Sequence, residues 1–201
     1  MTIDRRVSSI ESSFKMESMP FDAECRQRVR DVLVKKVSAA DAITELNKKY
    51  RVSKKQVERS RVWLHKHLFS DVYSWAGKTR TVDISKGTIF CLVQFIESQF
   101  DDLYRNLKKE NFLADITDKE EMSKRLAYYL GEINMIHPFR EGNGRTQRIY
   151  IEQLCLNNGR FEIDFTDVSK EEMIVASVRS ANASNDMLEN LIKSCLFEHQ
   201  Q

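Results

Sequence analysis

Apolar positions in the first third of the chain recur at the three- and four-residue spacing of a helix face. Ser8 and Glu11 fit a helix-capping box, and Pro20 disfavours helix in the residue before it. Ser38 can cap a later helix whose apolar face includes Ala42 and Leu46. The sequence therefore predicts helices over about residues 8–18, 22–36, 38–50 and 53–69.

The pattern changes after this helical run. Tyr73–Gly77 is typical of a turn, and Thr79–Ile84 alternates in the manner of a short strand. Lys86-Gly87 supplies a turn, after which Thr88–Cys91 suits a return strand. The segment predicts one β-hairpin, which must lean on helices because a lone hairpin is marginally stable.

Helical patterns resume and continue to the end of the chain. Thr117 and Glu120 fit a second capping box, and Asn157-Asn158-Gly159 is a common helix stop. The predicted helices cover about residues 93–110, 117–136, 144–157, 169–180 and 185–196. The fold class is thus mostly α, a helical bundle core with one β-hairpin, preceded by a smaller helical module. A seam near Tyr50-Arg51 separates a module of residues 1–50 from a domain of residues 51–201.

Composition narrows the function classes. The chain has 201 residues with 32 basic and 30 acidic side chains, so its net charge of +2 gives no electrostatic footprint for nucleic acid or membrane. No run approaches the roughly 20 apolar residues of a membrane span, and the N-terminus lacks an apolar leader, so we expect a cytoplasmic protein. The widely spaced cysteines are expected to be free thiols in a reducing compartment. They are Cys25, Cys91, Cys155 and Cys195.

The loop and helix start from His137 to Arg148 concentrate unusual residue types. Gly142 and Gly144 permit positive φ and a close approach of backbone N–H groups to a ligand. A helix begins there, and free N–H groups with the positive end of the helix dipole form an anion site. Arg145 and Arg148 lie three apart on one helix face, and Asn143 adds an amide, which together indicate a polyphosphate. A helix-capping turn with a structural histidine is the alternative.

Two further side chains in this segment complete a reaction site. Polyphosphates bind with Mg²⁺, which takes one or two carboxylates, and Glu141 is the carboxylate at hand. His137 can accept a proton from an attacking hydroxyl near neutral pH. The combination of base, metal ligand and anion site indicates nucleotidyl or phosphoryl transfer, and the absence of a G-x-x-x-x-G-K-[ST] sequence excludes a P-loop.

The same residues, HPFREGNGRTQR, resemble the signature of the Fic family, H-P-F-x-[D/E]-G-N-G-R-x-x-R, at every fixed position. The stretch Leu64–Gly77 is similar to the run that precedes the family's hairpin, and the resemblance covers about residues 55–195. It implies a Fic-type helical core and transfer of AMP from ATP to a Ser, Thr or Tyr hydroxyl of a target protein.

The resemblance also implies a role for each fixed position. His137 would deprotonate the target hydroxyl, and Glu141 would hold Mg²⁺ between the α- and β-phosphates. Arg145 would bind the β-phosphate and Arg148 the γ-phosphate. Three residues would form the anion hole: Gly142, Asn143 and Gly144.

The hairpin would be a flap that binds the target's backbone as an added strand. Its residues are Thr79, Arg80, Thr81, Val82, Asp83, Ile84, Ser85, Lys86 and Gly87. The alternative is a ribbon that only covers the core.

The first helix carries a candidate inhibitory motif. Ser13 and Glu17 share one helix face, and they are similar to the Fic motif [S/T]-x-x-x-E-[G/N], with Ser18 in the last position. Glu17 would pair with Arg148 and so compete with the γ-phosphate. The following helices resemble the antitoxin module that some Fic toxins use as a separate partner, which suggests a toxin–antitoxin pair fused in one chain. The alternative is an ordinary amphipathic helix with a solvated glutamate.

Other functions also fit the sequence. Residues 42–64 also resemble a helix-turn-helix, whose second helix carries Lys54, Lys55, Arg59 and Arg61, so a DNA-binding regulator with a differently acting Fic-like domain is the alternative function. Within Fic-like enzymes, transfer of UMP, a phosphorylated group or phosphocholine, or removal of AMP, are further outcomes. The target's identity and a homo-oligomeric state are also left open.

Overall fold

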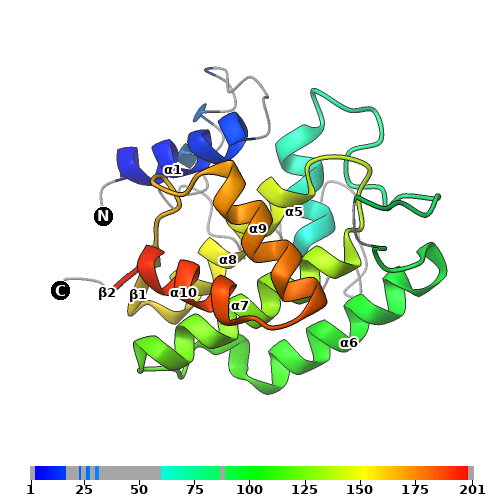
Figure 1. The fold of residues 1–201 in the computed structure, drawn as a ribbon. Helices are drawn as coiled ribbons and strands as arrows, with labels where there is room; N and C mark the ends of the chain where they lie inside the picture. The colour runs from blue at the N-terminus through cyan, green and yellow to red at the C-terminus, as the bar shows by residue number, and fades with distance from the viewer. Residues whose placement is uncertain are drawn as a thin grey trace.

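The structure is a computed structural model, and it describes residues 3–16, 60–86 and 89–198, together with residues 23, 26–27 and 30–31. The protein is mostly helical, as predicted (Figure 1). The α-helices are α1 (Ile3–Met16), α5 (Ser60–Phe69), α6 (Ile96–Lys109), α7 (Lys119–Ile136), α8 (Asn143–Asn158), α9 (Lys170–Asn182) and α10 (Asp186–Cys195). Shorter elements are the 3-10 helices η1 (Val93–Phe95) and η2 (Asn111–Leu113) and the strands β1 (Phe161–Ile163) and β2 (Leu196–Glu198).

Helix α7 runs through the middle of the bundle and packs against α6, α8, α9 and α10 (Figure 1). Most of its apolar side chains are buried, because neighbours cover it on several sides. Gly131 of α7 has Ser180 of α9 so close that a Cβ atom would lie 2.6 Å from the serine Oγ. The missing side chain lets α9 approach α7 closely, and this places α9 as one wall of the pocket described below.

Helix α8 is the second central element, and it contacts α1, α5, α7 and β1. Almost every residue from Asn143 to Cys155 is buried. The helix ends at Gly159, which has a φ of 76° and caps the last turn, as the Asn-Asn-Gly sequence predicted. Because both faces of α8 are covered, its first turn is held in a defined position.

The two-stranded sheet is formed by other residues than the strands that the sequence predicted. β1 and β2 pair antiparallel, with Phe161 opposite Glu198 and Ile163 opposite Leu196. The two predicted strands over 79–84 and 88–91 do not form among the described residues, where one isolated bridge joins Ser85 and Ile89. That part of the prediction is wrong, although the segment still turns back on itself, and we call it the hairpin segment (residues 79–91).

Several helix boundaries also differ from those predicted. α1 begins at Ile3, so Ser8 lies inside the helix, where its hydroxyl donates to the carbonyl oxygen of Asp4 at 3.0 Å. The cap of α7 is Asp118 rather than Thr117, because the Asp118 carboxylate accepts the backbone N–H of Glu121 at 2.8 Å. A full capping box does occur before α9.

Parts of the N-terminal prediction lie outside the described residues. These are the helix over 38–50, the seam at 50–51, the residues 53–59 and Glu17. The ion pairs Arg26–Glu11 and Arg30–Asp4 join the described residues of the second predicted helix to α1. Within the described ranges, no helix combines the length and the hydropathy needed to cross a membrane.

Candidate active site

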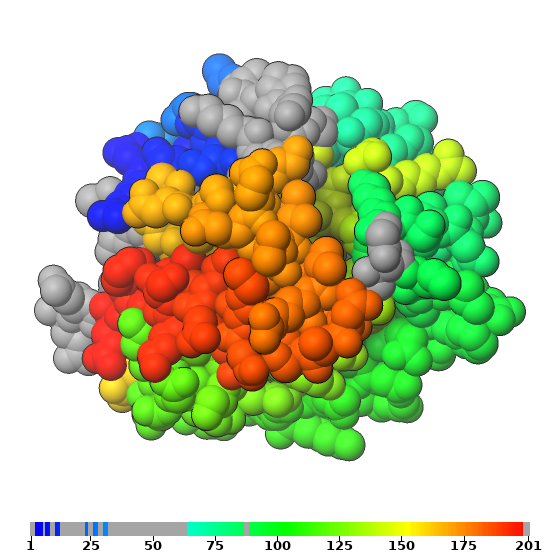
Figure 2. All heavy atoms as spheres, viewed as in Figure 1, coloured from blue at the N-terminus to red at the C-terminus, as the bar shows by residue number. Residues whose placement is uncertain are grey.

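The described part of the chain contains a pocket of about 410 Å³, within the roughly 300–1,000 Å³ typical of small-molecule sites. The stretch from Glu141 to Arg148 forms one side, and Asn134 and His137 at the end of α7 form another. Figure 2 shows a recess between α9, in orange, and the hairpin segment, in green. The α9 wall is mostly apolar and consists of Met173, Ile174, Val178 and Ala181, with Lys170 and Ser177 as its polar members.

His137 lies at the point where α7 ends. Its φ of 43° and ψ of 61° are left-handed, and this conformation turns the chain out of the helix. The Nδ1 atom lies 3.2 Å from the carbonyl oxygen of Asn134. A carbonyl only accepts, so Nδ1 carries the proton and Nε2 keeps its lone pair. The imidazole ring stacks on Phe90, with 3.9 Å between ring centroids.

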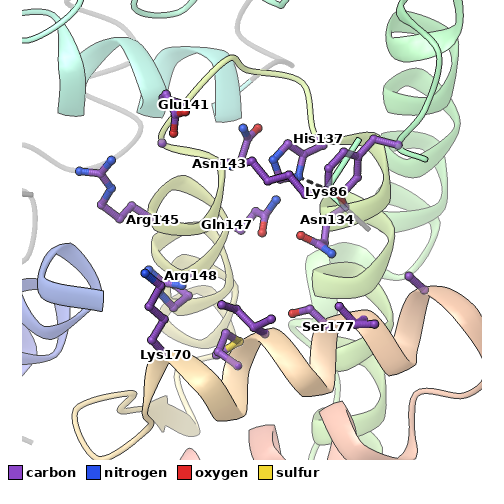
Figure 3. Close-up of a pocket in the computed structure, with 17 residues that line it drawn as sticks. Lys86, Asn134, His137, Glu141, Asn143, Arg145, Gln147, Arg148, Lys170 and Ser177 are labelled. Carbon is purple, nitrogen blue, oxygen red and sulfur yellow. Dashed lines mark hydrogen bonds between the residues drawn. The ribbon is translucent and has the colours of Figure 1, made fainter. Parts of the chain in front are cut away.

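The surroundings of His137 favour its neutral form. The pKa of the imidazole is lowered to about 4, chiefly by burial and to a smaller extent by the positive charges of Lys86 and Arg80, while the hydrogen bond to Asn134 acts in the opposite direction. Near neutral pH the side chain is therefore uncharged and able to accept a proton. Figure 3 shows His137 beside Lys86 and Asn134 at the pocket.

The loop between His137 and α8 is held by an internal hydrogen-bonded pair. The Asn143 side chain accepts the backbone N–H of Phe139 at 2.9 Å and donates to the Phe139 carbonyl oxygen at 2.7 Å. The sequence suggested that this amide would bind the anion, but the structure uses it to shape the loop. Any contribution of Asn143 to the expected anion site would then come from its backbone N–H.

Gly142 begins α8 in a conformation that only glycine adopts readily. Its φ is 79°, and an added Cβ atom would lie 2.6 Å from a ring carbon of Phe69. The first N–H groups of a helix have no acceptor within the helix, so the start of α8 is a place where backbone N–H groups can bind an anion. Gly142, Asn143, Gly144 and Arg145 all line the pocket.

Both arginines of the signature line the same pocket. Arg145 is fully buried, and its guanidinium lies over the Phe69 ring, 4.5 Å from the centroid. Arg148 is 6% exposed and comes from the next turn of α8. In Figure 3, Glu141 lies at one end of the view and Arg148, near Lys170, at the other, with Arg145 between them. The arrangement spreads positive charge along one wall.

Arg80 joins the hairpin segment to the end of α7. It is 1% exposed, and its Nε donates to the carbonyl oxygen of His137 at 2.9 Å. Other guanidinium nitrogens donate to the carbonyls of Val82, at 2.8 Å, and Cys91. Its backbone N–H donates to the Pro138 carbonyl oxygen at 2.8 Å. These bonds take up the carbonyls that a strand ladder would use, which explains the missing strands.

Burial separates Arg80 from the rest of the predicted flap. Lys86 lines the pocket, while Gly87 lies outside the described residues. The exposed members are Thr79, Thr81, Val82, Asp83, Ser85 and Lys86, and Ile84 is half-buried. Among the described residues of the predicted flap, these are accessible to a partner.

His65 was not among the residues that the sequence analysis singled out for the site. It is fully buried, and its Nε2 lies 2.9 Å from the carbonyl oxygen of Glu141. Burial lowers its pKa to about 4, with a smaller contribution from the Arg145 charge, against the raising effect of the bond to Glu141. The only sequence signal was its place in the run Leu64–Gly77, because its partners are distant along the chain.

The inhibitory motif is only partly covered by the structure. The backbone of Ser13 lies in α1, while its side chain and the whole of Glu17 lie outside the described residues. α1 contacts α8, the helix that carries Arg148, and Val7 of α1 is fully buried. Arg5 of α1 also forms an ion pair with Asp164 at 2.8 Å. The first helix is thus packed against the helix that carries the site.

Comparison with known proteins places the chain in a family. A sequence profile of the Fic/DOC family matches residues 58–155. The protein adenylyltransferase VbhT of Bartonella schoenbuchensis is 45% identical over 136 residues, a match that covers 67% of this chain and 28% of VbhT. The "probable protein adenylyltransferase Fic" of Escherichia coli K12 is 35% identical over 136 residues, covering 67% of each chain. The chain therefore belongs to the Fic/DOC family.

A solved structure supports the fold. The N-terminal Fic domain of a VirB-translocated Bep effector protein from Bartonella quintana, which has bound ADP, superposes with a TM-score of 0.65 at 25% identity. The superposition covers 71% of this chain and 74% of that one. The protein thus has the Fic fold, with the signature loop at the start of α8.

Proposed function

We propose that this chain transfers AMP from ATP to a hydroxyl group of a target protein. The observation that carries the proposal is the position of His137, which presents an unprotonated Nε2 to the pocket lined by the first turn of α8. The pocket has a cationic, N–H-rich side for phosphates and an apolar α9 side suited to a nucleobase. The relatives named as protein adenylyltransferases and the ADP-bound Fic domain support this assignment.

The reaction balances with the residues at hand. The target hydroxyl gives its proton to Nε2 of His137 as its oxygen forms a bond to the α-phosphorus of ATP. The bond between that phosphorus and the bridging oxygen of the β-phosphate breaks, and pyrophosphate leaves. Arg145, Arg148 and the N–H groups of the α8 start stabilise the phosphate charge.

The residues present fit a magnesium ion that arrives with ATP. Glu141 is the carboxylate of the signature loop that lines the pocket, and Mg²⁺ in nucleotide sites typically takes one or two carboxylates beside phosphate oxygens and water. When bound, the ion would offset phosphate charge. The residue proposed to hold it is Glu141.

The hairpin segment is proposed to dock the target. Val82 and Ile89 are 54% and 75% exposed, and Lys86 lies at the pocket edge. An extended target chain that pairs with this segment would bring its hydroxyl to His137. The buried Arg80 would keep the segment beside His137 through its bond to the His137 carbonyl.

We further propose that α1 inhibits transfer. Glu17, which follows α1 along the chain, would pair with Arg148 and displace the γ-phosphate, with Ser13 supporting it from α1. The contact between α1 and α8 supports this proposal, because α1 lies next to the helix that carries Arg148.

A labelling experiment tests the function. Wild type, Glu17→Gly and Glu17→Gly/His137→Ala proteins are incubated with Mg²⁺ and either α-³²P- or γ-³²P-labelled ATP in a cell lysate. Relative to the same lysate without added protein, we expect additional label on protein from the α-labelled nucleotide only, with the first two proteins and not with the third. Label from the γ-position would indicate phosphoryl transfer, and label retained without His137 would remove its assigned role.

A further inference from the structure

His65 has a hydrogen-bond partner at each ring nitrogen. The backbone N–H of Gly77 donates to Nδ1 at 2.9 Å, so Nδ1 must be the unprotonated nitrogen. The proton is then on Nε2, which donates to the Glu141 carbonyl oxygen at 2.9 Å. The histidine therefore connects the turn that ends at Gly77 with the signature loop.

The hydrogen bond from His65 to the Glu141 carbonyl oxygen also sets the direction of the backbone N–H of Gly142. In a trans peptide the C=O and N–H point to opposite sides. With the Glu141 carbonyl directed at the His65 ring, the N–H of Gly142 points away from that ring. Glu141 and Gly142 both line the pocket, so the orientation of this one peptide affects both the proposed metal ligand and the start of the anion site.

Packing leaves the His65 ring little freedom. Its centroid lies 3.8 Å from that of Phe139, in a stacked arrangement, and 4.8 Å from that of Phe69. Phe69 in turn occupies the space where a Cβ atom on Gly142 would lie, and its ring lies under the Arg145 guanidinium. The side chain is thus held by packing and by two hydrogen bonds, which is what a group that orients another group requires.

We propose that His65 is a positioning residue for AMP transfer, and that its Nε2–H orients the Glu141–Gly142 peptide toward the nucleotide. The proposal rests on the function proposed above, but its structural part can be tested without turnover. His65 itself touches neither substrate nor the reacting atoms. Its effect is on the direction in which the loop presents its backbone.

The six glycines of the chain provide a direct probe. Protein labelled with [¹⁵N]glycine gives one amide signal for each, and three of them report on this site: Gly77, Gly142 and Gly144. We expect His65→Phe, which keeps a ring but has no donor, to shift the Gly77 and Gly142 signals. Addition of Mg²⁺ and ATP should shift the Gly142 and Gly144 signals in wild type and much less in this variant.

Kinetics distinguish orientation from packing. In the Glu17→Gly background, we expect His65→Phe to lower kcat/KM for ATP roughly 10- to 100-fold, as for other groups that orient a ligating residue. His65→Gln has an amide donor and an acceptor, so it should restore most of the activity and the wild-type Gly142 signal. His67→Gln, on the same helix but not lining the pocket, should match the parent protein.

The outcomes separate the two proposals. If His65→Phe leaves the Gly142 signal and its response to nucleotide unchanged, or if the glutamine and phenylalanine variants behave alike, the positioning role is wrong. If the phenylalanine variant does not fold, His65→Met replaces it as the variant without a donor. If no protein transfers AMP but the glycine signals change as expected, the proposed function fails while the role of His65 in orienting the peptide stands.

Discussion

The Nδ1 atom of His137 donates its proton to the carbonyl oxygen of Asn134, one turn earlier in α7. The bond fixes both the tautomer and the direction of the ring, since the carbonyl belongs to a buried helix. Asn134 would therefore act on the proposed proton acceptor through its backbone, which the residue type at that position does not reveal.

We expect the acid limb of the pH profile to lie well below the usual histidine value. Burial lowers the pKa of His137 to about 4, so Nε2 stays unprotonated down to about pH 5 and becomes protonated below it. The kcat/KM for ATP of the Glu17→Gly protein should thus be independent of this histidine between about pH 5.5 and 8 and fall as the pH approaches 4. Circular dichroism at each pH controls for unfolding. A limb centred near 6.5 would contradict the assignment.

Two glycines with nearly the same backbone conformation provide a matched pair. Gly142 and Gly159 have φ of 79° and 76°, but a Cβ atom would collide with Phe69 at Gly142 and would meet nothing within 4 Å at Gly159. We expect Gly159→Ala to cost about 1 kcal/mol of stability, from the unfavourable φ alone. Gly142→Ala should cost more and also weaken nucleotide binding, because its strain lies in the anion site.

Denaturant unfolding and equilibrium dialysis with labelled ATP measure these two effects. The comparison removes the general cost of alanine at positive φ, so the remaining difference reports the contact with Phe69. Equal losses of stability and of nucleotide binding in both variants would show that the close approach has no special role.

Features that depend on residues close together along the chain could be predicted from the sequence, and features that depend on contacts between distant residues could not. The two ends of α8 and the start of α9 were predicted to within one residue. They depend on adjacent residues, such as Gly159 after α8 and the Ser169–Glu172 capping box before α9. The strands of the hairpin segment were predicted wrongly, because the buried guanidinium of Arg80 binds carbonyls that the alternating pattern assigned to a ladder.

The candidate site shows the same division. The pocket lining from His137 to Arg148 could be read from the sequence because the residues are contiguous and match a specific signature. The contact of His65 with Glu141 joins residues far apart in the chain, and the pairing of β1 with β2 does so too. Such contacts depend on how the helices pack, and neither periodicity nor local spacing carries that information.

Removal of the proposed inhibitory carboxylate should activate the enzyme. Glu17→Gly and Glu17→Gln both take away the charge that would compete for Arg148, so we expect each to raise the initial rate of AMP incorporation several-fold or more, since a charged hydrogen bond contributes roughly 1.5–3 kcal/mol. Glu121→Gln is the control, because it removes an exposed carboxylate of α7 that does not line the pocket and should leave the rate unchanged. Inhibition through Glu17 is wrong if both glutamate variants remain at the wild-type rate.

The ion pair between Arg5 and Asp164 provides a second way to weaken the contact of α1 with the core. Asp164 has a side chain only 3% exposed, and Arg5, 60% exposed, reaches it from α1 at 2.8 Å. Removing the arginine leaves a buried carboxylate with one partner fewer, and the docked position of α1 should then be populated less.

If α1 inhibits transfer only while docked, Arg5→Ala should raise the rate in the wild-type background. In the Glu17→Gly background the same change should have little further effect, because the inhibitory group is already gone. Initial rates of the four proteins in this double-mutant cycle measure the coupling. Additive effects would mean that Arg5 acts on the site independently of Glu17, and a lower rate in both backgrounds would mean that α1 supports the active fold instead of inhibiting it.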